Sequence, residues 1–356
     1  MKKDSRRRLI LMYGCAAVLL VVTAACILYP NREGLQIRHA RKKVESAHQL
    51  AWYYADRGEF LKARALFVES LDTSRQCLGH RHALTLTALN NLGWTEKALG
   101  NYGKALRCFE EVSAARAALL GESHKATLTS QVNLASVLLA RGDLERSEFI
   151  YKEVLDKRRS SLPADDPDRI NSLVLLGSFY RSCGRFDLAE PILKDAYSRA
   201  NEVLEEHSPV ALYAMEELGA LYISQGKNVD AQPLYLEILD RLVSRLGEEH
   251  VDVMRSRETL GGIYRATGDL EKAVSIQEAT LLVRQERHGH GHLQVASGFY
   301  NLSRTYEQMG RTGKALEALA QAHAVSRQSL GSAHPWTRAI EQDILRLQKN
   351  APVARQ

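Results

Sequence analysis

Apolar positions in this chain return every 42 residues over most of its length. A leucine recurs at this step, and we call these seven residues the leucine ladder: Leu50, Leu92, Leu134, Leu176, Leu218, Leu260 and Leu302. The residue after each ladder leucine is small: Ala51, Gly93, Ala135, Gly177, Gly219, Gly261 and Ser303. A glycine keeps the same step: Gly58, Gly100, Gly142, Gly184, Gly226, Gly268 and Gly310. A fixed period of this length is typical of a solenoid, in which each repeat packs mainly against its neighbours.

Each period predicts two helices. The first ends at the ladder glycine, because glycine readily adopts the left-handed conformation of a helix C-cap. In Gly142-Asp143-Leu144 and Gly268-Asp269-Leu270 the second helix starts at an aspartate, which favours N-caps. A small residue five positions after the glycine lets the two helices approach: Ala63, Ala105, Ser147, Ala189, Ala231, Ala273 and Ala315. A Leu-Gly turn such as Leu78-Gly79 ends the second helix, and histidines follow in phase: His82, His124, His250, His292 and His334.

These elements resemble the tetratricopeptide repeat. The order of leucine, small residue, aromatic residue, glycine and alanine matches that family, with Tyr54, Tyr180, Tyr222, Tyr264 and Tyr306 as the aromatic residues. The 42-residue step, the Leu-Gly-x-x-His turn and the phrase Leu89-Asn90-Asn91-Leu92-Gly93 resemble the kinesin light chain type. The resemblance implies an all-α, right-handed α-solenoid of helix-turn-helix repeats whose first helices line a concave groove. It does not imply a motor role, because nothing here resembles the heptads that join a kinesin light chain to its heavy chain.

We expect six segments along the chain. They are a basic tail at 1–8, a transmembrane or signal-anchor helix at 9–29, a basic linker at 30–43, seven repeats at 44–334, a C-terminal capping helix at 335–348 and a tail at 349–356. The capping helix carries an apolar stripe of Ile340, Ile344 and Leu347, as expected for a helix that covers the open end of a solenoid.

The run Leu9–Tyr29 contains 21 uncharged residues and follows a basic tail. About 20 apolar residues span a bilayer as a helix, whereas cleaved signal peptides have apolar runs of about 7–15 residues. We therefore expect a single-pass anchor. A cleaved signal is one alternative, and a bacterial lipoprotein with Cys26 as the lipidated residue is another.

The flanking charges weakly favour an N-terminus inside, with the repeats periplasmic or otherwise extracytoplasmic. The unpaired Cys77, Cys108 and Cys183 favour the opposite placement, because free thiols are typical of a reducing compartment. The orientation therefore stays open.

The formal net charge of +6 lies in the basic segments before residue 46, so the repeats themselves are close to neutral. We therefore expect no nucleic-acid partner. His288-Gly289-His290-Gly291-His292 overlays the Leu-Gly-x-x-His turn, and a closed metal site needs three or four convergent ligands. Gly100-Asn101-Tyr102-Gly103-Lys104 lacks the Ser or Thr of a phosphate-binding loop. We expect no metal, cofactor, small-molecule substrate or enzymatic activity.

The groove that the resemblance implies is where we expect a ligand. If the ladder leucines face the core, residues two and five positions before and after them face the other way, since a helix advances about 100° per residue. Tryptophans hold these positions in the first two repeats and arginines cluster in the later ones. The predicted contacts, including asparagines that precede the leucines, are Trp52, Asn90, Asn91, Trp94, Lys97, Asn133, Arg181, Arg255, Arg265, Tyr300, Asn301 and Arg304.

We expect an extended peptide with an aromatic or aliphatic anchor near Trp52 and Trp94, where the small Ala55 leaves room, and carboxylates near the arginines. Two alternatives are open. Trp52 belongs instead to the N-terminal cap, and the arginines pair with glutamates of neighbouring repeats. Asparagines such as Asn133 either clamp a peptide backbone, as the resemblance suggests, or bridge to the next repeat.

The sequence thus predicts a membrane-tethered scaffold that binds protein or peptide partners. The alternative is a lipid-anchored or secreted chaperone-like module that captures exported chains.

Overall fold

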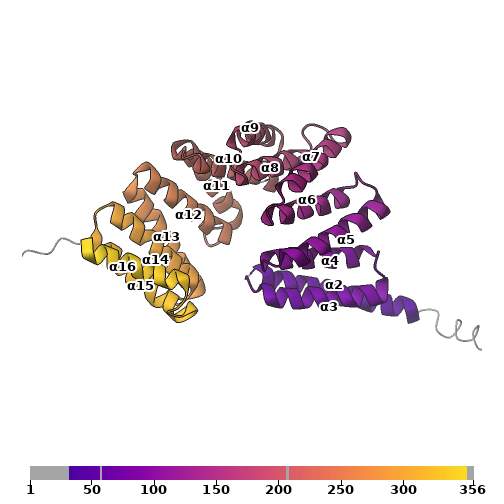
Figure 1. Cartoon of the computed structure of the whole chain (residues 1–356), viewed down its shortest axis with the longest axis horizontal. Helices are drawn as coiled ribbons and strands as arrows, with labels where there is room; N and C mark the ends of the chain where they lie inside the picture. Colours follow the sequence, from indigo (N-terminus) through magenta and orange to yellow (C-terminus); the bar gives the residue numbers. More distant parts are fainter. Residues whose placement is uncertain (1–31, 57, 206–207, 351–356) are drawn as a thin grey trace, which may run out of the picture. The chain divides into compact units, whose positions relative to one another are not determined.

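The computed structural model describes residues 32–56, 58–205 and 208–350. These residues form fifteen α-helices and no strand (Figure 1). The helices are α2 (Arg32–Asp56), α3 (Phe60–Leu78), α4 (Ala83–Ala98), α5 (Tyr102–Leu120), α6 (Lys125–Ala140), α7 (Leu144–Ser161), α8 (Pro167–Ser182), α9 (Phe186–Val203), α10 (Pro209–Ser224), α11 (Asn228–Leu246), α12 (Val251–Thr267), α13 (Leu270–His288), α14 (Leu293–Gln308), α15 (Thr312–Leu330) and α16 (Pro335–Asn350).

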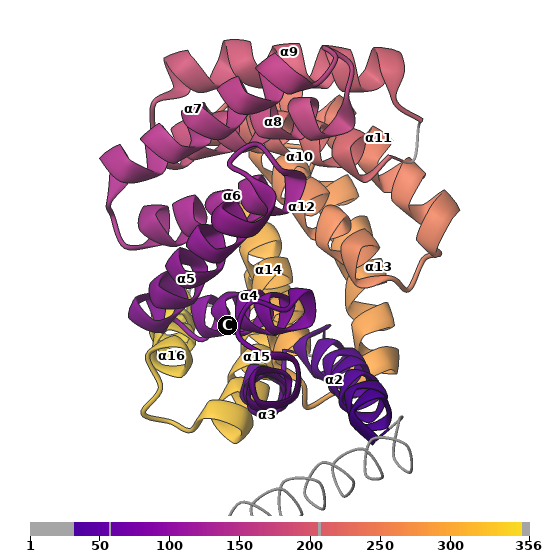
Figure 2. The same ribbon diagram turned by 90° about the vertical axis from the view of Figure 1, so that its right-hand side faces the viewer.

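Even-numbered helices from α2 to α14 are the first helices of the seven repeats, and the odd-numbered helices are the second ones. Consecutive helices from α2 to α6 and from α8 to α16 pack against each other, as α8, α9, α10 and α11 show in Figure 2. The chain divides into two compact units, with the division after Lys157 inside α7. We call them the N-terminal and C-terminal units and describe each by itself.

The ladder glycines end the first helices as predicted, because φ at all seven lies between 70° and 89°. The second helices begin less simply. The carboxylate of Asp143 accepts a 3.4 Å hydrogen bond from the Arg146 backbone N–H, whereas Asp269 stands at the N-cap of α13 without a capping hydrogen bond from its side chain. Asp269 instead forms an ion pair with Lys272 at 3.3 Å.

The phased histidines are N-caps of α4, α6, α12, α14 and α16. The Nδ1 atoms of His82, His124, His250, His292 and His334 each accept a 3.2 Å hydrogen bond from the backbone N–H two residues later. Asp166 does the same at the equivalent place in α8, where its Oδ1 lies 2.8 Å from the Asp168 nitrogen. The recurring histidine therefore has a structural role, which the sequence analysis did not identify.

Replacing His124 with alanine removes this acceptor, and we expect it to destabilise the first turn of α6 by about 1 kcal/mol. His124→Asp is the matched control, because Asp166 shows that a carboxylate caps this turn. Hydrogen exchange of the amides that begin α6 should rise in the alanine variant and stay near wild type in the aspartate variant. Equal protection in all three proteins would show that the cap contributes nothing.

The small residue after each ladder leucine lies where the second helix crosses. A Cβ added to Gly177 would lie 2.5 Å from Cγ of the buried Leu193. A Cβ on Gly219 would lie 2.8 Å from the ring of Tyr235, and one on Gly93 would lie 3.0 Å from the ring of Phe109. Only a residue without a side chain allows these helices so close.

The ladder leucines are buried as expected in the last five repeats, with exposed fractions from 1% to 9%. Leu50 differs, since 45% of it is exposed. The reason is positional: the described chain holds no repeat before α2 to cover it. Tyr53 is 55% exposed for the same reason, although its counterparts Thr95 and Val137 are fully buried.

The start of the array departs from simple expectation. The segment that we expect as a linker, 30–43, is helical from Arg32 onward and continues into the first repeat without a break. Ala40 and Val44 already face the core, which gives this part of α2 a packed side. At the other end α16 buries Ile340 and Leu347 against the preceding helices.

The predicted membrane segment Leu9–Tyr29 and the proposed lipidation residue Cys26 lie outside the described residues. Among the helices that are described, none combines the length and apolarity needed to cross a bilayer.

Candidate functional site

The predicted tryptophans meet in the N-terminal unit. The rings of Trp52 in α2 and Trp94 in α4 lie 5.1 Å apart between centroids, tilted by 48°. Trp52 also contacts Phe67 at 5.8 Å, and Trp94 contacts Phe60 at 5.9 Å. The two indoles remain 37% and 36% exposed. We call these four residues the aromatic cluster. It offers a partly exposed apolar surface.

The expectation that Ala55 leaves room for a ligand side chain is wrong. Ala55 is only 5% exposed and packs in a core cluster with Ala63 and Phe67. The reason is that α3 folds back over this position, a contact that the geometry of α2 alone does not include. Phe60 and Phe67, which the sequence analysis did not single out, supply the packing.

Predicted polar contacts of α4 are joined to α6. The Asn133 Nδ2 donates a 3.0 Å hydrogen bond to Oδ1 of Asn90, and the Lys97 ammonium donates one of 3.0 Å to the Ser136 hydroxyl. Burial lowers the pKa of Lys97. The bridging interpretation therefore describes Asn133, yet this bond leaves the Asn90 amino group and the Asn133 carbonyl oxygen for other partners. Asn91 is buried, with 8% exposed.

In the C-terminal unit, two predicted arginines form ion pairs between neighbouring first helices. Arg181 in α8 contacts Glu217 in α10 at 3.0 Å, and Glu217 is mostly buried. Arg255 in α12 lies 3.7 Å from Glu216 and 3.1 Å from Asp252. Burial raises the pKa of Glu216, and Arg255 opposes that shift. The alternative of arginines paired with acids across repeats thus describes Arg181 and Arg255.

Arg265 in α12 and Arg304 in α14 line a hollow of about 480 Å³ together with Glu307 and Gln308. Glu307 is held by a two-pronged contact with Arg346 of α16. Within the described chain, neither Arg265 nor Arg304 forms an ion pair. Burial is the main cause that lowers the pKa of Arg265, and the positive charge of the neighbouring Arg304 lowers it further. Two like charges side by side favour an anion between them.

The last two predicted contacts lie close to these arginines in sequence and differ in environment. The Tyr300 hydroxyl donates a 3.0 Å hydrogen bond to Asp343 of α16. Asn301 is partly buried and lines a small cavity with Glu258 and Arg284. Tyr300 therefore ties α14 to the capping helix.

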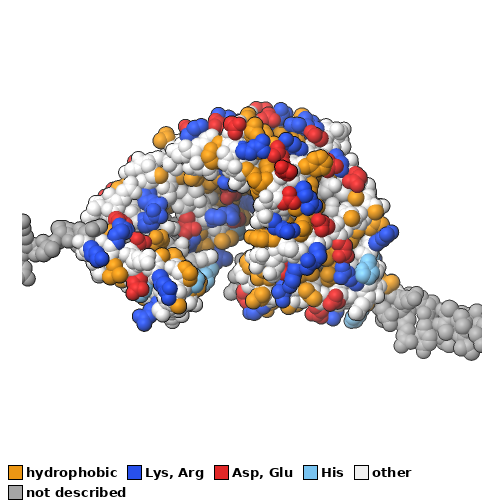
Figure 3. All heavy atoms as spheres, in the orientation of Figure 1, with side chains coloured by type: hydrophobic (Ala, Val, Ile, Leu, Met, Phe, Trp, Pro, Cys, Tyr) orange, Lys and Arg blue, Asp and Glu red, His pale blue; other side chains and the backbone are white. Residues whose placement is uncertain are grey.

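The structure brings seven of the twelve predicted residues together in two sets, one in each unit. We call Trp52, Trp94, Asn90, Lys97 and Asn133 the indole–amide surface, and Arg265 with Arg304 the arginine pair. On the face seen in Figure 3, Lys and Arg side chains are interspersed with Asp and Glu side chains. The rings of His288 and His292 stack at 4.6 Å, and His292 is engaged as an N-cap.

Solved structures resemble this chain in fold. One is a structure from Podosopora anserina of TPR-like repeats of the kinesin light chain type, which are described as nearly identical to one another. Its sequence is 24% identical to this chain, the match covers 58% of this chain and 96% of that structure's chain, and the TM-score is 0.47. BtubC (BKLC) from P. vanneervenii is 23% identical over 67% of this chain and 93% of its own, with a TM-score of 0.55.

A Rap protein complexed with Competence and Sporulation Factor is 12% identical over 89% of this chain and 98% of its own, with a TM-score of 0.51. No curated protein matches the chain.

The family comparison covers most of the chain. A model of the tetratricopeptide repeat matches residues 43–118, 96–160, 168–244 and 252–328. These matches include helices of all seven 42-residue repeats, and they agree with the helix pairs, turns and close crossings described above. The chain therefore belongs to the tetratricopeptide repeat family, whose repeats form protein-interaction scaffolds.

Proposed function

We propose that this protein is a membrane-tethered scaffold that binds an extended peptide segment of a partner on its first helices. The observation that carries the proposal is the indole–amide surface. Two tryptophans from successive repeats leave over a third of their surface exposed beside an asparagine pair. Tryptophan is among the residues that dominate binding hot spots, and amides pair with an extended backbone.

A solved structure of similar fold agrees with a bound partner in general terms. The Rap protein is described as complexed with Competence and Sporulation Factor. That partner belongs to the Rap protein. For this chain, we propose that its own first helices present a comparable binding surface.

The tether rests on the sequence of Leu9–Tyr29, whose 21 uncharged residues suit a membrane-spanning helix. We place the repeats on the extracytoplasmic side, following the basic residues of the N-terminal tail.

One purification tests both parts of the proposal. The full chain is captured from membranes washed with alkaline carbonate, and wild type is compared with Asn90→Ala/Trp94→Ala by quantitative mass spectrometry. Phe149→Ala is the control, because Phe149 is a 67% exposed aromatic residue on a second helix, α7. One or two stoichiometric partners lost only from the double variant would support a scaffold.

Other outcomes would contradict it. Many weak partners would indicate the chaperone-like alternative. An unchanged partner set would show that partners do not bind at the indole–amide surface. Absence of the protein from washed membranes would show that the chain is not tethered to the membrane.

The arginine pair adds a separate prediction. Arg265→Gln with Arg304→Gln should weaken binding of a carboxylate-bearing partner segment about tenfold, because one charge-assisted hydrogen bond contributes about 1.5–3 kcal/mol and exposure reduces it. The loss should shrink at high salt, as titration calorimetry at two ionic strengths would show. Arg338→Gln, an exposed arginine on α16, is the control. Equal affinities of the paired variant and this control would refute a role for the pair.

A further inference from the structure

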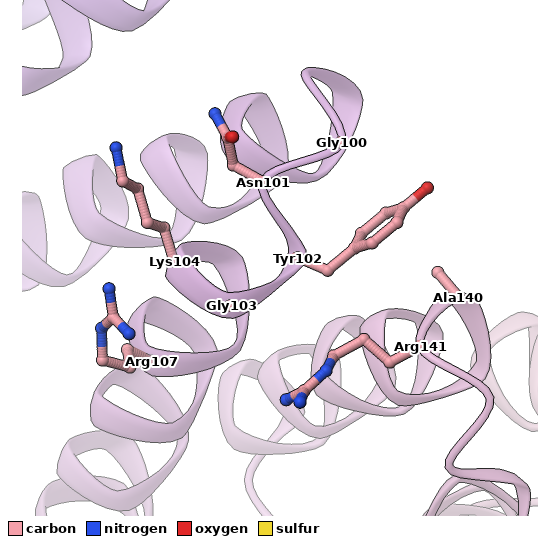
Figure 4. A pocket seen from close by; sticks show the side chains of 8 residues that line it. All are labelled: Gly100, Asn101, Tyr102, Gly103, Lys104, Arg107, Ala140 and Arg141. Atoms are coloured by element: carbon pink, nitrogen blue, oxygen red, sulfur yellow. The ribbon is translucent and has the colours of Figure 1, made fainter.

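A second basic surface lies at the turn between α4 and α5 and the end of α6. It is a hollow of about 570 Å³ whose lining includes Gly100, Tyr102, Gly103, Lys104, Arg107 and Arg141. Figure 4 shows Lys104 and Arg107 on α5, with Arg141 extending from the end of α6 toward α5. No carboxylate belongs to this lining.

The three cations are not neutralised by neighbours. Across the described residues, no ion pair or hydrogen bond engages the side chains of Lys104, Arg107 or Arg141. The third and sixth repeats differ at the position of Lys104. Arg146 lies 3.5 Å from Asp143, and Lys272 lies 3.3 Å from Asp269, in each case an acid three residues earlier.

In the second repeat that acid is replaced by Asn101. Its amide donates a 2.7 Å hydrogen bond to the carboxylate of Glu96, which is only 5% exposed. Glu96 is thus held behind the turn and is not part of the hollow. The substitution leaves a cluster of positive charge where the third and sixth repeats carry a balanced pair.

The backbone at this place is accessible. The first turn of α5 contains no acidic residue, and a Cβ at Gly103 would meet nothing within 4 Å. The partial positive charge of the helix N-terminus adds to that of the three side chains. Tyr102 is 37% exposed beside the cations and leans toward Ala140 in Figure 4.

We propose that this hollow binds a phosphate monoester, presented as a phosphorylated serine or threonine side chain of a partner protein. A phosphoryl group carries about −1.5 to −2 charges and three acceptor oxygens, which suits three cations better than a single carboxylate does. Arginine guanidinium groups match such oxygens with paired N–H donors, and the lysine supplies a compact charge. Tyr102 packs against the residue beside the phosphorylated one. This site is independent of the indole–amide surface.

The test uses the full chain in nonionic detergent and degenerate peptides with a central phosphoserine, serine or glutamate, followed by fluorescence polarisation. Wild type should bind the phosphoserine set about tenfold more tightly than the serine set. The variant Lys104→Gln/Arg107→Gln/Arg141→Gln should lose this preference. The control Arg38→Gln/Lys42→Gln/Arg81→Gln removes the same charge from exposed residues of the same unit and should keep it.

Three results would overturn the proposal. They are no preference for phosphoserine in wild type, an equal loss in both triple variants, and glutamate peptides that bind as well as phosphoserine peptides. Vesicles of phosphatidylserine and phosphatidylcholine provide a further arm. If the hollow variant loses vesicle binding while phosphopeptides show no preference, the site recognises a membrane surface instead. Trp94→Ala should leave the phosphoserine preference intact, which separates this proposal from the proposed function.

Discussion

Removal of both indoles, by Trp52→Ala with Trp94→Ala, is expected to weaken binding of a partner segment about a hundredfold. Truncating a hot-spot tryptophan typically reduces binding by 2 kcal/mol or more, and each 1.4 kcal/mol is a factor of ten. The two effects should be less than additive, because the rings lie 5.1 Å apart and each supports the other. Titration calorimetry with the partner segment measures the loss.

The same rings contact the core, so the variants need a folding control. Trp52 lies against Phe67, which is fully buried, and its removal exposes part of that ring. Trp94→Phe keeps an aromatic face and should lose less affinity than Trp94→Ala. If the double alanine variant binds as tightly as wild type while its hydrogen exchange is unchanged, the indoles are structural residues of the N-terminal end.

The second large effect concerns packing. Gly177→Ala should destabilise the contact between α8 and α9 by about 1–3 kcal/mol, because the new Cβ would lie 2.5 Å from Leu193 in a fully buried place. Gly262→Ala is the matched control. Its Cβ would meet nothing within 4 Å in the middle of α12, so we expect a gain of about 0.5–1 kcal/mol from helix propensity.

Hydrogen exchange is the suitable measurement, since repeat arrays do not unfold as one unit. Gly177→Ala should raise exchange in α8 and α9 and leave α4 and α5 unchanged. Gly262→Ala should leave exchange unchanged or slow it in α12. Protection of α8 and α9 equal to wild type would mean that Leu193 repacks freely, and the close crossing would not explain the glycine at this position.

The architecture could be predicted from the sequence because burial in a repeat array is itself periodic. A leucine buried in one repeat is buried in the next, so the ladder identifies the first helices and the glycines their ends. Trp52 and Trp94 occupy the same position in successive repeats, which is why their contact across 42 residues is also foreseeable. Leu50 is the exception, because a periodic argument does not include the end of an array.

The site was less predictable because it depends on contacts between repeats. Ala55 is buried because α3 packs over it, and a helical wheel of α2 alone does not include that neighbouring helix. Arg181 pairs with Glu217, whereas Arg265 pairs with no described carboxylate. This difference follows from side-chain reach rather than from sequence spacing. The hollow at Arg141 has no carboxylate in its lining, and Asn101 stands there where the third and sixth repeats carry an acid.

Site-specific photo-crosslinking in cells tests the central claim most directly. A photoreactive amino acid is placed on a first helix at Thr129, and on second helices at Phe149 or Val229, all exposed positions. We predict that Thr129 captures a partner segment and that Trp94→Ala abolishes this capture. Capture from Phe149 or Val229 alone would contradict it and would assign partner binding to the second helices.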